Sequence, residues 1–393
     1  MTTRRVLVVG AGTRFLSGIS YYTHRLAVSL AGEHRVSVLL MRRMMPAALY
    51  PGKERVGTEL VRLTYPPGVT VQDGLDWFWG ASAVRALALL RRERPEVIVL
   101  QWWTGTVLHS YLLVALVGRW LGARVVLEVH EAQDVGEMDI PLAGRYVARV
   151  FPVLLRRCAA VVVHSAFDRD LVDQHFGLQD TPVRLIPHGP YTLEGLDERA
   201  EDGERGSPDG ADRPCRLLSF GVIRPFKGVE DLLEAFAMLT EQEARAFRLT
   251  VVGETWEGWT RPAEMIAAHP HRELITFVNR YVDDDEVTGF FAAADAVVLP
   301  YHRSSSSGPL QMAMGNGRPV LVTSVGGLVE AAEGYQGAVF VPPHDPVAIR
   351  AALPELARRA GTRYSSASSW ARTSSGYAAL FDQLLPADAG PAP

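Results

Sequence analysis

The sequence contains almost no lysine and almost no cysteine. Of its 40 basic residues only Lys53 and Lys227 are lysines, which leaves 38 arginines. Cys158 and Cys215 are the only cysteines, and two such distant cysteines form neither a disulfide framework nor a zinc site of ordinary spacing. Because arginine carries nearly every positive charge, the retention of a lysine at position 227 asks for a specific explanation.

The sequence also lacks a hydrophobic run that would span a membrane. Its most apolar stretch, residues 107–129, is interrupted by His109, Arg119 and Arg124 and indicates a helix, a turn and a buried strand. The first residues, "MTTRRVLVVGAG", begin a strand without an apolar signal segment, so we expect a cytoplasmic protein.

The net charge of −4 argues against a dedicated nucleic-acid binder. The charge is unevenly distributed, at +6 over residues 1–190 and −10 over residues 191–393. The basic first half weakly favours an anionic acceptor or a peripheral contact with the inner face of the membrane.

A chain of 393 residues is long enough for two domains. Short apolar runs alternate with helical patterns over residues 1–193, and the alternation restarts over residues 215–365. This pattern is typical of α/β domains in which helices cover both faces of a parallel sheet. The runs expected to form strands in the first domain are "RVLVVG", "RVSVLL", "VIVLQ", "RVVLEVH", "AVVVHS" and "VRLIPHG". Those in the second domain are "CRLLSFG", "FRLTVVG", "ITFVN", "AVVLP", "RPVLVTS" and "AVFVPP".

Three further segments complete the predicted organisation. Residues 194–214 hold 8 acidic residues and 3 arginines with almost nothing apolar, which predicts a flexible acidic linker. Residues 366–386 show a helical apolar pattern around Trp370, and residues 387–393 predict a disordered tail. Ligands of doubly wound sheets bind beyond the carboxyl ends of the strands, so we expect the site in a cleft between the two domains.

The stretch "FGVIRPFKG" follows the first strand of the second domain and projects Arg224 and Lys227. A guanidinium beside a compact ammonium group suits a diphosphate, and a retained lysine suggests a geometry that arginine does not supply. The alternative is a pair of solvated surface charges.

A serine- and glycine-rich turn, Ser304 to Gly308, follows another buried strand and precedes a helix expected from about Pro309 to Met314. The backbone amides of Ser307 and Gly308 would form an anion-binding nest at the start of this helix. The alternative is a low-complexity serine loop, which its place between a strand and a helix disfavours.

In the first domain, Gly10, Gly12 and Gly18 lie between a strand and a helix, although Phe15 breaks the dinucleotide-binding pattern G-x-G-x-x-G. A ligand contact and a flexible loop explain these glycines equally well. His130 follows a buried strand, with Glu131 and Asp134 beside it in sequence. It is either a structural histidine or a group that hydrogen-bonds a sugar hydroxyl. No nucleophile elbow and no metal-ligand spacing is present.

At these residues the sequence resembles the retaining glycosyltransferases of family 4, which have the GT-B fold. "FGVIRPFKGVEDLLEAF", "VRLIPHGPY" and the stretch from "YVDDDEVTGFF" to "VTSVGGLVE" carry the resemblance most strongly. It implies two Rossmann-like doubly wound domains facing a cleft, an acceptor domain followed by a nucleotide-sugar-binding domain. It also implies a last helix that returns to the first domain.

The resemblance assigns roles to individual residues. It makes Arg224 and Lys227 the pair that grips the donor diphosphate, and it places His130 near the transferred sugar. The donor-binding residues that it implies are Gly18, Ser307, Gly308, Pro309 and Gln311. It implies neither a metal nor a cofactor.

Two departures from the family pattern concern the donor site. The Glu-x7-Glu pair of many members is replaced by Ser304 and Met312, so the ribose contact must come from elsewhere, with Gln311 or the backbone as candidates. A subgroup with a Ser-Gly turn in place of the glutamates resembles this stretch. The donor arginine is commonly two positions earlier, where this chain has Val222.

The function expected from the resemblance is transfer of a sugar from a nucleoside-diphosphate sugar to an acceptor hydroxyl with retention, a reaction of the hexosyltransferase type. The acceptor is a glycan, a lipid-linked sugar or a natural product. The alternatives are another GT-B enzyme, such as a sugar-nucleotide epimerase or a phosphorylase, and a non-catalytic nucleotide-sugar-binding protein.

Overall fold

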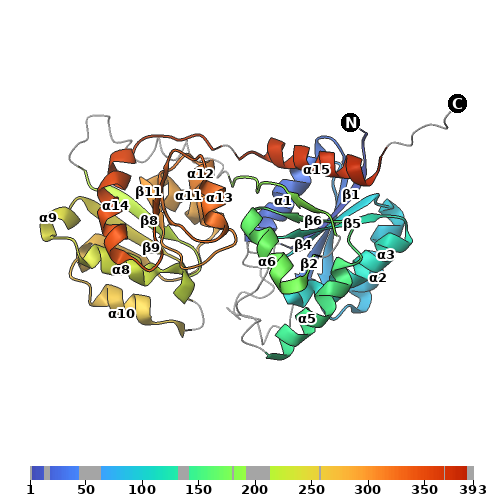
Figure 1. The fold of residues 1–393 in the computed structure, drawn as a ribbon, viewed down its shortest axis with the longest axis horizontal. Coiled ribbons are helices and arrows are strands. Elements are labelled where there is room, and N and C mark those ends of the chain that lie inside the picture. The colour runs from blue at the N-terminus through green and yellow to red at the C-terminus, as the bar shows by residue number, and fades with distance from the viewer. Residues whose placement is uncertain are drawn as a thin grey trace. The chain divides into compact units, whose positions relative to one another are not determined.

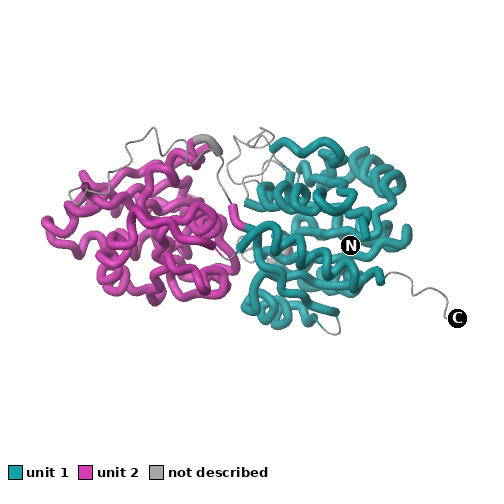
Figure 2. Tube along the Cα trace, turned by 90° about the horizontal axis from the view of Figure 1, so that it is seen from above, with its two compact units in different colours: residues 1–189, 368–393 teal, residues 190–367 magenta. Residues whose placement is uncertain are grey.

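The computed structural model describes residues 2–12, 18–43, 63–131, 141–178, 181–191, 213–255, 258–366 and 368–386. The chain divides into two compact units (Figure 2), unit 1 with residues 1–189 and 368–393 and unit 2 with residues 190–367. Of the expected linker 194–214, only Arg213 and Pro214 lie within the described residues, and the expected tail 387–393 lies outside them.

Unit 1 is built on a seven-stranded sheet of described residues in the order β3-β2-β1-β4-β5-β6-β7, with every neighbouring pair parallel. Its central strands are buried along their length, as expected for continuous apolar runs covered on both faces. The strands of unit 1 are β1 (Arg5–Ala11), β2 (Arg35–Arg43), β3 (Thr70–Asp76), β4 (Val97–Trp102), β5 (Arg124–Val129), β6 (Ala160–Val163) and β7 (Val183–Leu185).

Helices lie on both sides of this sheet (Figure 1). They are α1 (Gly18–Ala31), α2 (Gly80–Glu93), the short η3 (Gly105–Val107), α3 (Leu108–Trp120), α5 (Pro141–Leu155), α6 (Ala166–Phe176) and α15 (Trp370–Leu384). The last of these, drawn in red, comes from the end of the chain and packs against α1 in unit 1 (Figure 1). The Ser29 hydroxyl donates to the carbonyl of Trp370 at 3.1 Å, and the Thr373 hydroxyl donates to the carbonyl of Pro187 at 2.8 Å.

Unit 2 repeats the design with a six-stranded parallel sheet of described residues in the order β10-β9-β8-β11-β12-β13. Its strands are β8 (Cys215–Phe220), β9 (Phe247–Val252), β10 (Ile275–Val278), β11 (Ala296–Leu299), β12 (Val320–Thr323) and β13 (Ala338–Val341). Its helices are η4 (Pro225–Lys227), α8 (Val229–Ala237), α9 (Glu241–Ala244), α10 (Arg261–Ala267), η6 (Arg272–Leu274), α11 (Asp284–Ala293), α12 (Gly308–Gly315), α13 (Gly327–Ala332) and α14 (Pro346–Arg359).

Every strand expected from an apolar run is present, which confirms the α/β fold class. The edge strand β3 was not predicted, because "TVQDGLD" contains two aspartates and a glycine, which are poor strand formers, and exposes residues over its first half. In each sheet the chain adds strands first on one side and then on the other. The change falls between β1 and β4 in unit 1 and between β8 and β11 in unit 2. Loops after these strands are where ligands of such sheets bind.

Candidate functional site

The loop that follows β8 carries Arg224 and Lys227 and is pressed against the end of β11. Arg224 caps η4, and Gly228 ends η4 with a left-handed φ of 63°. A Cβ atom at Gly228 would overlap the carbonyl oxygen of Pro300. Only glycine combines this backbone conformation with this close approach, so Gly228 fixes where the loop lies.

Aromatic rings hold the cations of this loop. The Lys227 amine lies 3.7 Å from the centre of the Tyr301 ring and 5.4 Å from that of Phe226, and the Arg224 guanidinium lies 5.9 Å from the Phe226 ring centre. Cation–π contacts position a positive charge without neutralising it. No carboxylate among the described residues lies within ion-pair distance of Lys227. The lysine charge therefore remains available to an anionic ligand.

The serine-rich turn that follows β11 leads into α12. Ser307 caps this helix, since its hydroxyl accepts from the Leu310 amide at 3.2 Å, and the same hydroxyl donates to the Tyr301 hydroxyl at 3.4 Å. Within the described part of the chain, the backbone amides of Ser307 and Gly308 donate to no protein acceptor. Such amides at a helix start are suited to an anion.

The two loops lie next to each other in unit 2. Tyr301 contacts Lys227 in one loop and Ser307 in the other. A Cβ atom at Gly221, directly after β8, would be 3.5 Å from Cγ of Pro309. The structure thus brings the predicted residues Arg224, Lys227, Ser307, Gly308 and Pro309 together at the switch point of the sheet.

Gln311 is buried in the first turns of α12, at 4% exposure, and its Oε1 atom has no hydrogen-bond partner among the described residues. A buried polar atom without a partner is uncommon and fits a group that a ligand completes. Ser304, at the position of the first family glutamate, donates from its hydroxyl to the carbonyl of Ser306, and its own carbonyl accepts from the Gly327 amide.

The predicted residues of unit 1, Gly18 and His130, lie at the edge of its sheet where the parallel strands end. Gly18 is the first residue of α1, and residues 13–17 of the preceding loop lie outside the described residues. A Cβ atom at Gly10 would overlap the side chains of Gln101 and Thr23, so this glycine serves packing between β1, β4 and α1. His130 follows β5, and its amide donates to the carbonyl of Trp102 at 2.9 Å.

His130 is not the lone histidine that its sequence neighbourhood suggests. It stands in a buried group with His164 and His188, which follow β6 and β7. Its acidic neighbour is Glu128, with Nε2 of His130 3.5 Å from Oε2, whereas Glu131 is exposed and Asp134 lies outside the described residues. Residues two apart along an extended segment point to the same side, so the end of β5 places Glu128 next to His130.

Glu128 is fully buried and well supplied with donors. Its Oε1 accepts from the Tyr22 hydroxyl at 2.6 Å, and its Oε2 accepts from Nε2 of Gln101 at 3.1 Å. Burial alone would raise the pKa of Glu128, but the nearby His130 and His164 and the Tyr22 hydroxyl outweigh burial and lower that pKa to about 2. Burial lowers the pKa of His164 to about 4, with His130 adding to the effect.

Sequence reasoning missed Tyr301, Glu128, Tyr22, His164 and His188. A signal for the histidines was present, because three successive strands of the first domain end in "VH", "VH" and "LIPH". The carboxyl ends of neighbouring parallel strands lie at one edge of the sheet, so these histidines could have been predicted to lie close together.

Two groups of described residues place a carboxylate and two imidazoles with ligand atoms within 4.8 Å: Glu128, His130, His164 in unit 1, and Asp231, His302, His344 in unit 2. Members of both groups interact with other protein side chains. Glu128 accepts from Tyr22 and Gln101, while Nε2 of His302 lies 2.9 Å from Oδ2 of Asp231. We assign no metal to either group.

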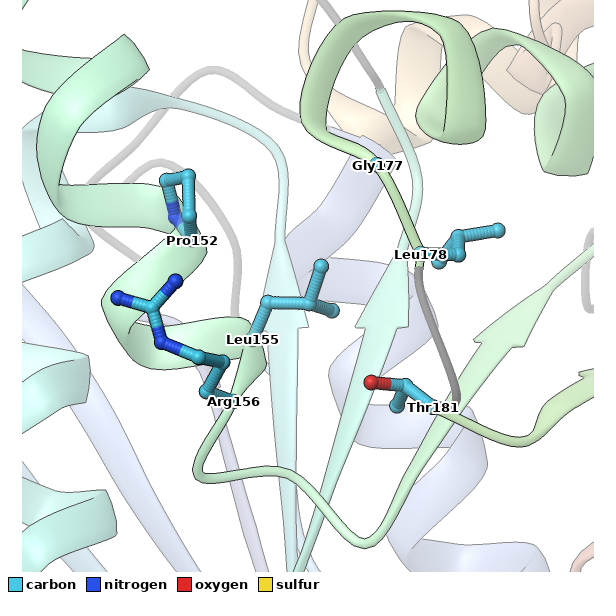
Figure 3. Close-up of a pocket in the computed structure, with 6 residues that line it drawn as sticks. All are labelled: Pro152, Leu155, Arg156, Gly177, Leu178 and Thr181. Carbon is cyan, nitrogen blue, oxygen red and sulfur yellow. The ribbon is translucent and has the colours of Figure 1, made fainter.

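A separate small pocket lies in unit 1 between the end of α5 and the segment after α6 (Figure 3). Its lining includes Pro152, Leu155, Arg156, Gly177, Leu178 and Thr181. None of the predicted site residues lines it, and we assign it no function.

Two family models match the chain. The model described as "Glycosyl transferase 4-like domain" matches residues 17–189, and that described as "Glycosyl transferases group 1" matches residues 214–359. The chain is 32% identical over 393 aligned positions to D-inositol 3-phosphate glycosyltransferase from Salinispora tropica, covering 92% of this chain and 80% of the relative. It is 25% identical over 365 positions to glycogen synthase from Mycobacterium tuberculosis, covering 86% and 82%.

Solved structures share the fold at low sequence identity. Sucrose-phosphate synthase from Thermosynechococcus elongatus aligns with a TM-score of 0.66 at 18% identity, covering 97% of this chain and 99% of that chain. The catalytic domain of starch synthase IV from Arabidopsis thaliana, bound to ADP and acarbose, aligns with a TM-score of 0.65 at 13% identity over the same fractions.

The two doubly wound units and the aligned structures define a GT-B fold. The chain belongs to glycosyltransferase family 4, and is thus an enzyme of the hexosyltransferase type. No helix among the described residues has the length and apolarity needed to cross a bilayer.

Proposed function

We propose that this protein transfers a sugar from a nucleoside-diphosphate sugar to an acceptor hydroxyl with retention of the anomeric configuration. The observation that carries the proposal is the contact of two loops through Tyr301 in unit 2: the loop of Arg224 and Lys227, and the turn of Ser307 and Gly308. One loop offers positive charge, and the other offers backbone amides at a helix start. Both are groups that bind phosphate oxygens.

These groups would act on the leaving diphosphate. As the bond between the sugar and the diphosphate breaks, negative charge builds on the diphosphate and positive charge builds on the sugar ring. Lys227 and Arg224 stabilise the negative charge, and their fixed placement on aromatic rings means that little reorganisation is needed. Removing one such contact typically costs on the order of 2–4 kcal/mol of transition-state stabilisation.

The remaining residues have supporting roles in the proposal. Gln311 contacts the nucleoside in place of the absent glutamate, because its buried Oε1 atom lacks a protein partner among the described residues. Gly308 and Pro309 form the start of α12 that faces the phosphate, and Gly18 starts the helix at the corresponding edge of unit 1. His130 contacts the transferred sugar.

The proposed reaction follows a front-face path in which the leaving oxygen takes the proton of the acceptor hydroxyl. The enzyme then needs no nucleophile and no metal. Activity should therefore persist in the presence of a chelator, and a strict requirement for Mg²⁺ would overturn this part of the proposal.

We propose an acceptor that is a glycan, a lipid-linked sugar or a small natural product. The relative from Salinispora tropica, whose name specifies an inositol phosphate, adds a phosphorylated cyclitol to the classes worth testing. A cytoplasmic location and a peripheral membrane contact remain predictions from the sequence.

The test proceeds in two steps. Thermal-shift measurements with nucleoside diphosphates and their sugars identify the donor, because a ligand that binds the folded state raises its stability. Transfer from that donor to an acceptor panel is then followed by NMR, which reports the anomeric configuration of the product. A retained configuration supports the proposal. Donor epimerisation without an acceptor, phosphorolysis, or tight binding without turnover would contradict it.

A further inference from the structure

In the buried histidine group of unit 1, the hydrogen-bond partners determine which ring nitrogens carry protons. Nδ1 of His164 lies 2.9 Å from the carbonyl oxygen of Ile186. A carbonyl oxygen only accepts hydrogen bonds, so Nδ1 of His164 carries the proton. In a neutral imidazole Nε2 then has a lone pair and must act as the acceptor. Burial supports this neutral form, since it lowers the pKa of His164 to about 4.

This assignment determines the proton on the next ring. Nε2 of His164 lies 3.2 Å from Nδ1 of His130. Because Nε2 of His164 accepts, Nδ1 of His130 donates and carries a proton. The chain of hydrogen bonds therefore runs from His130 through His164 to the carbonyl of Ile186.

The other nitrogen of His130 then faces a carboxylate. Nε2 of His130 lies 3.5 Å from Oε2 of Glu128, and within the described residues it has no hydrogen-bond partner. Nε2 of His164 is farther from the carboxylate, 3.8 Å from Oε1, and its lone pair accepts the proton of His130. A neutral His130 would instead direct an unshared lone pair at the buried anion, which is repulsive in a medium of low dielectric constant. A proton on Nε2 instead creates an ion pair and compensates the buried charge of Glu128.

We propose that Glu128 and His164 are positioning residues that hold His130 with protons on both ring nitrogens, opposite an ionised Glu128. Tyr22 and Gln101 support this state, because both donate to Glu128 and so favour its carboxylate form. The low pKa of Glu128, about 2, agrees with an ionised carboxylate.

The other titratable groups that face this arrangement do not supply the compensating charge. His188 follows β7, and burial lowers its pKa well below the usual value, which makes it neutral. On α15, Tyr377 is buried, and burial raises its pKa well above the usual value, so it is neutral as well. Trp370 of the same helix contacts Tyr22 and does not titrate.

The arrangement restricts what His130 can do. A ring whose two nitrogens both hold protons and face Glu128 and His164 has no lone pair with which to act as a general base. Where the role of His130 in catalysis is concerned, this inference rests on the proposed function. In that reaction His130 contributes a fixed positive charge at the carboxyl end of β5, and Glu128 and His164 keep its ring in place.

The test is NMR on the full-length protein labelled with ¹⁵N-histidine, at pH 7. Long-range ¹H–¹⁵N correlations distinguish an imidazolium from the two neutral tautomers, and His130→Gln and His164→Gln assign the signals. We expect an imidazolium pattern for His130 and a neutral, Nδ1-protonated pattern for His164. In Glu128→Gln, His130 should become neutral. His175→Gln, which removes an exposed histidine of α6, should change only its own signal.

A neutral His130 in the wild-type protein, or an unchanged imidazolium in Glu128→Gln, would overturn the proposal. If Glu128→Gln does not fold, Tyr22→Phe removes only one donor to Glu128, and the imidazolium pattern should weaken. In the transfer assay Glu128→Gln should lower kcat by on the order of tenfold with little change in the donor KM. If the wild-type protein shows no transfer, the proposed function fails while the NMR spectrum still decides the proton arrangement.

Discussion

The amine of Lys227 lies 3.7 Å from the ring centre of Tyr301, a residue that is only 2% exposed. The hydroxyl of the same tyrosine receives a hydrogen bond from Ser307, the cap of α12. One buried ring thus fixes a cation from the loop after β8 beside the helix start after β11. This contact places the compact ammonium group of Lys227, and an arginine there would present a planar fork of donors in different directions.

Lys227→Ala should reduce kcat/KM of transfer by about 10²- to 10³-fold, because it removes the charge that we propose stabilises the leaving diphosphate. Lys227→Arg should restore only part of the loss, since the charge returns with a different geometry. Steady-state kinetics with the donor found by thermal shift measures both variants. Arg245→Ala, which removes an exposed cation of unit 2 paired with Glu241, serves as the matched control and should behave like wild type.

Gly228→Ala should destabilise the protein more than Gly334→Ala. Both glycines have a left-handed φ, 63° and 75°, so both variants introduce backbone strain of about 1–2 kcal/mol. A methyl group at position 334 meets nothing within 4 Å, whereas at position 228 it overlaps the carbonyl oxygen of Pro300. Urea unfolding measures the free energy of unfolding of each variant. Equal losses would show that the close approach of the loop to β11 is absent in solution.

Ser307→Ala should weaken diphosphate binding, whereas Ser369→Ala should not. Both serines are helix caps whose hydroxyls accept from the amide three residues later, so each variant should lose about 1 kcal/mol of stability. Ser307 additionally orders, through its bond to Tyr301, the turn that we propose faces the phosphate. Isothermal titration with the nucleoside diphosphate separates the effects, and equal affinities in both variants would count against a phosphate at α12.

Stability should fall as the pH drops below neutrality. The pKa of His164 is about 4 in the folded protein against 6.5 ordinarily, so the unfolded chain binds its proton first and stability is lost between pH 6.5 and 4. The pKa of Glu128 is about 2 against 4.5, so its stabilising contribution is present above pH 4.5 and is lost toward pH 2.

Urea unfolding at pH 7 and pH 5 measures the first of these losses, which should be at least about 1 kcal/mol. His164→Gln should show a smaller difference between the two pH values, whereas His175→Gln should retain the wild-type difference. A His164→Gln variant that keeps the full wild-type difference would contradict a buried, neutral His164.

The sequence predicts most of the fold and part of the site. Buried parallel strands appear as continuous apolar runs, so their number and order along the chain could be predicted, whereas β3 could not, because its aspartates and glycine disfavour a strand. Arg224, Lys227 and Ser307 could be found because charged or serine-rich turns directly follow such runs. Their contact through Tyr301 required the structure, since strand order in the sheet determines which loops are neighbours.

The surroundings of His130 could not be predicted from the sequence. The sequence places Glu131 and Asp134 beside it, whereas the structure brings it next to Glu128, at the end of β5, and His164, directly after β6. Which side chains share a buried face depends on register and burial together, and both become known only with the fold.

The central claim is that the loop of Arg224 and Lys227 holds the diphosphate of the donor. A crystal structure of the protein with the nucleoside diphosphate that stabilises it tests this claim most directly. We predict diphosphate oxygens within hydrogen-bond distance of the Lys227 amine and the amides of Ser307 and Gly308. A diphosphate bound elsewhere, with Lys227 facing only solvent and Tyr301, would contradict the account.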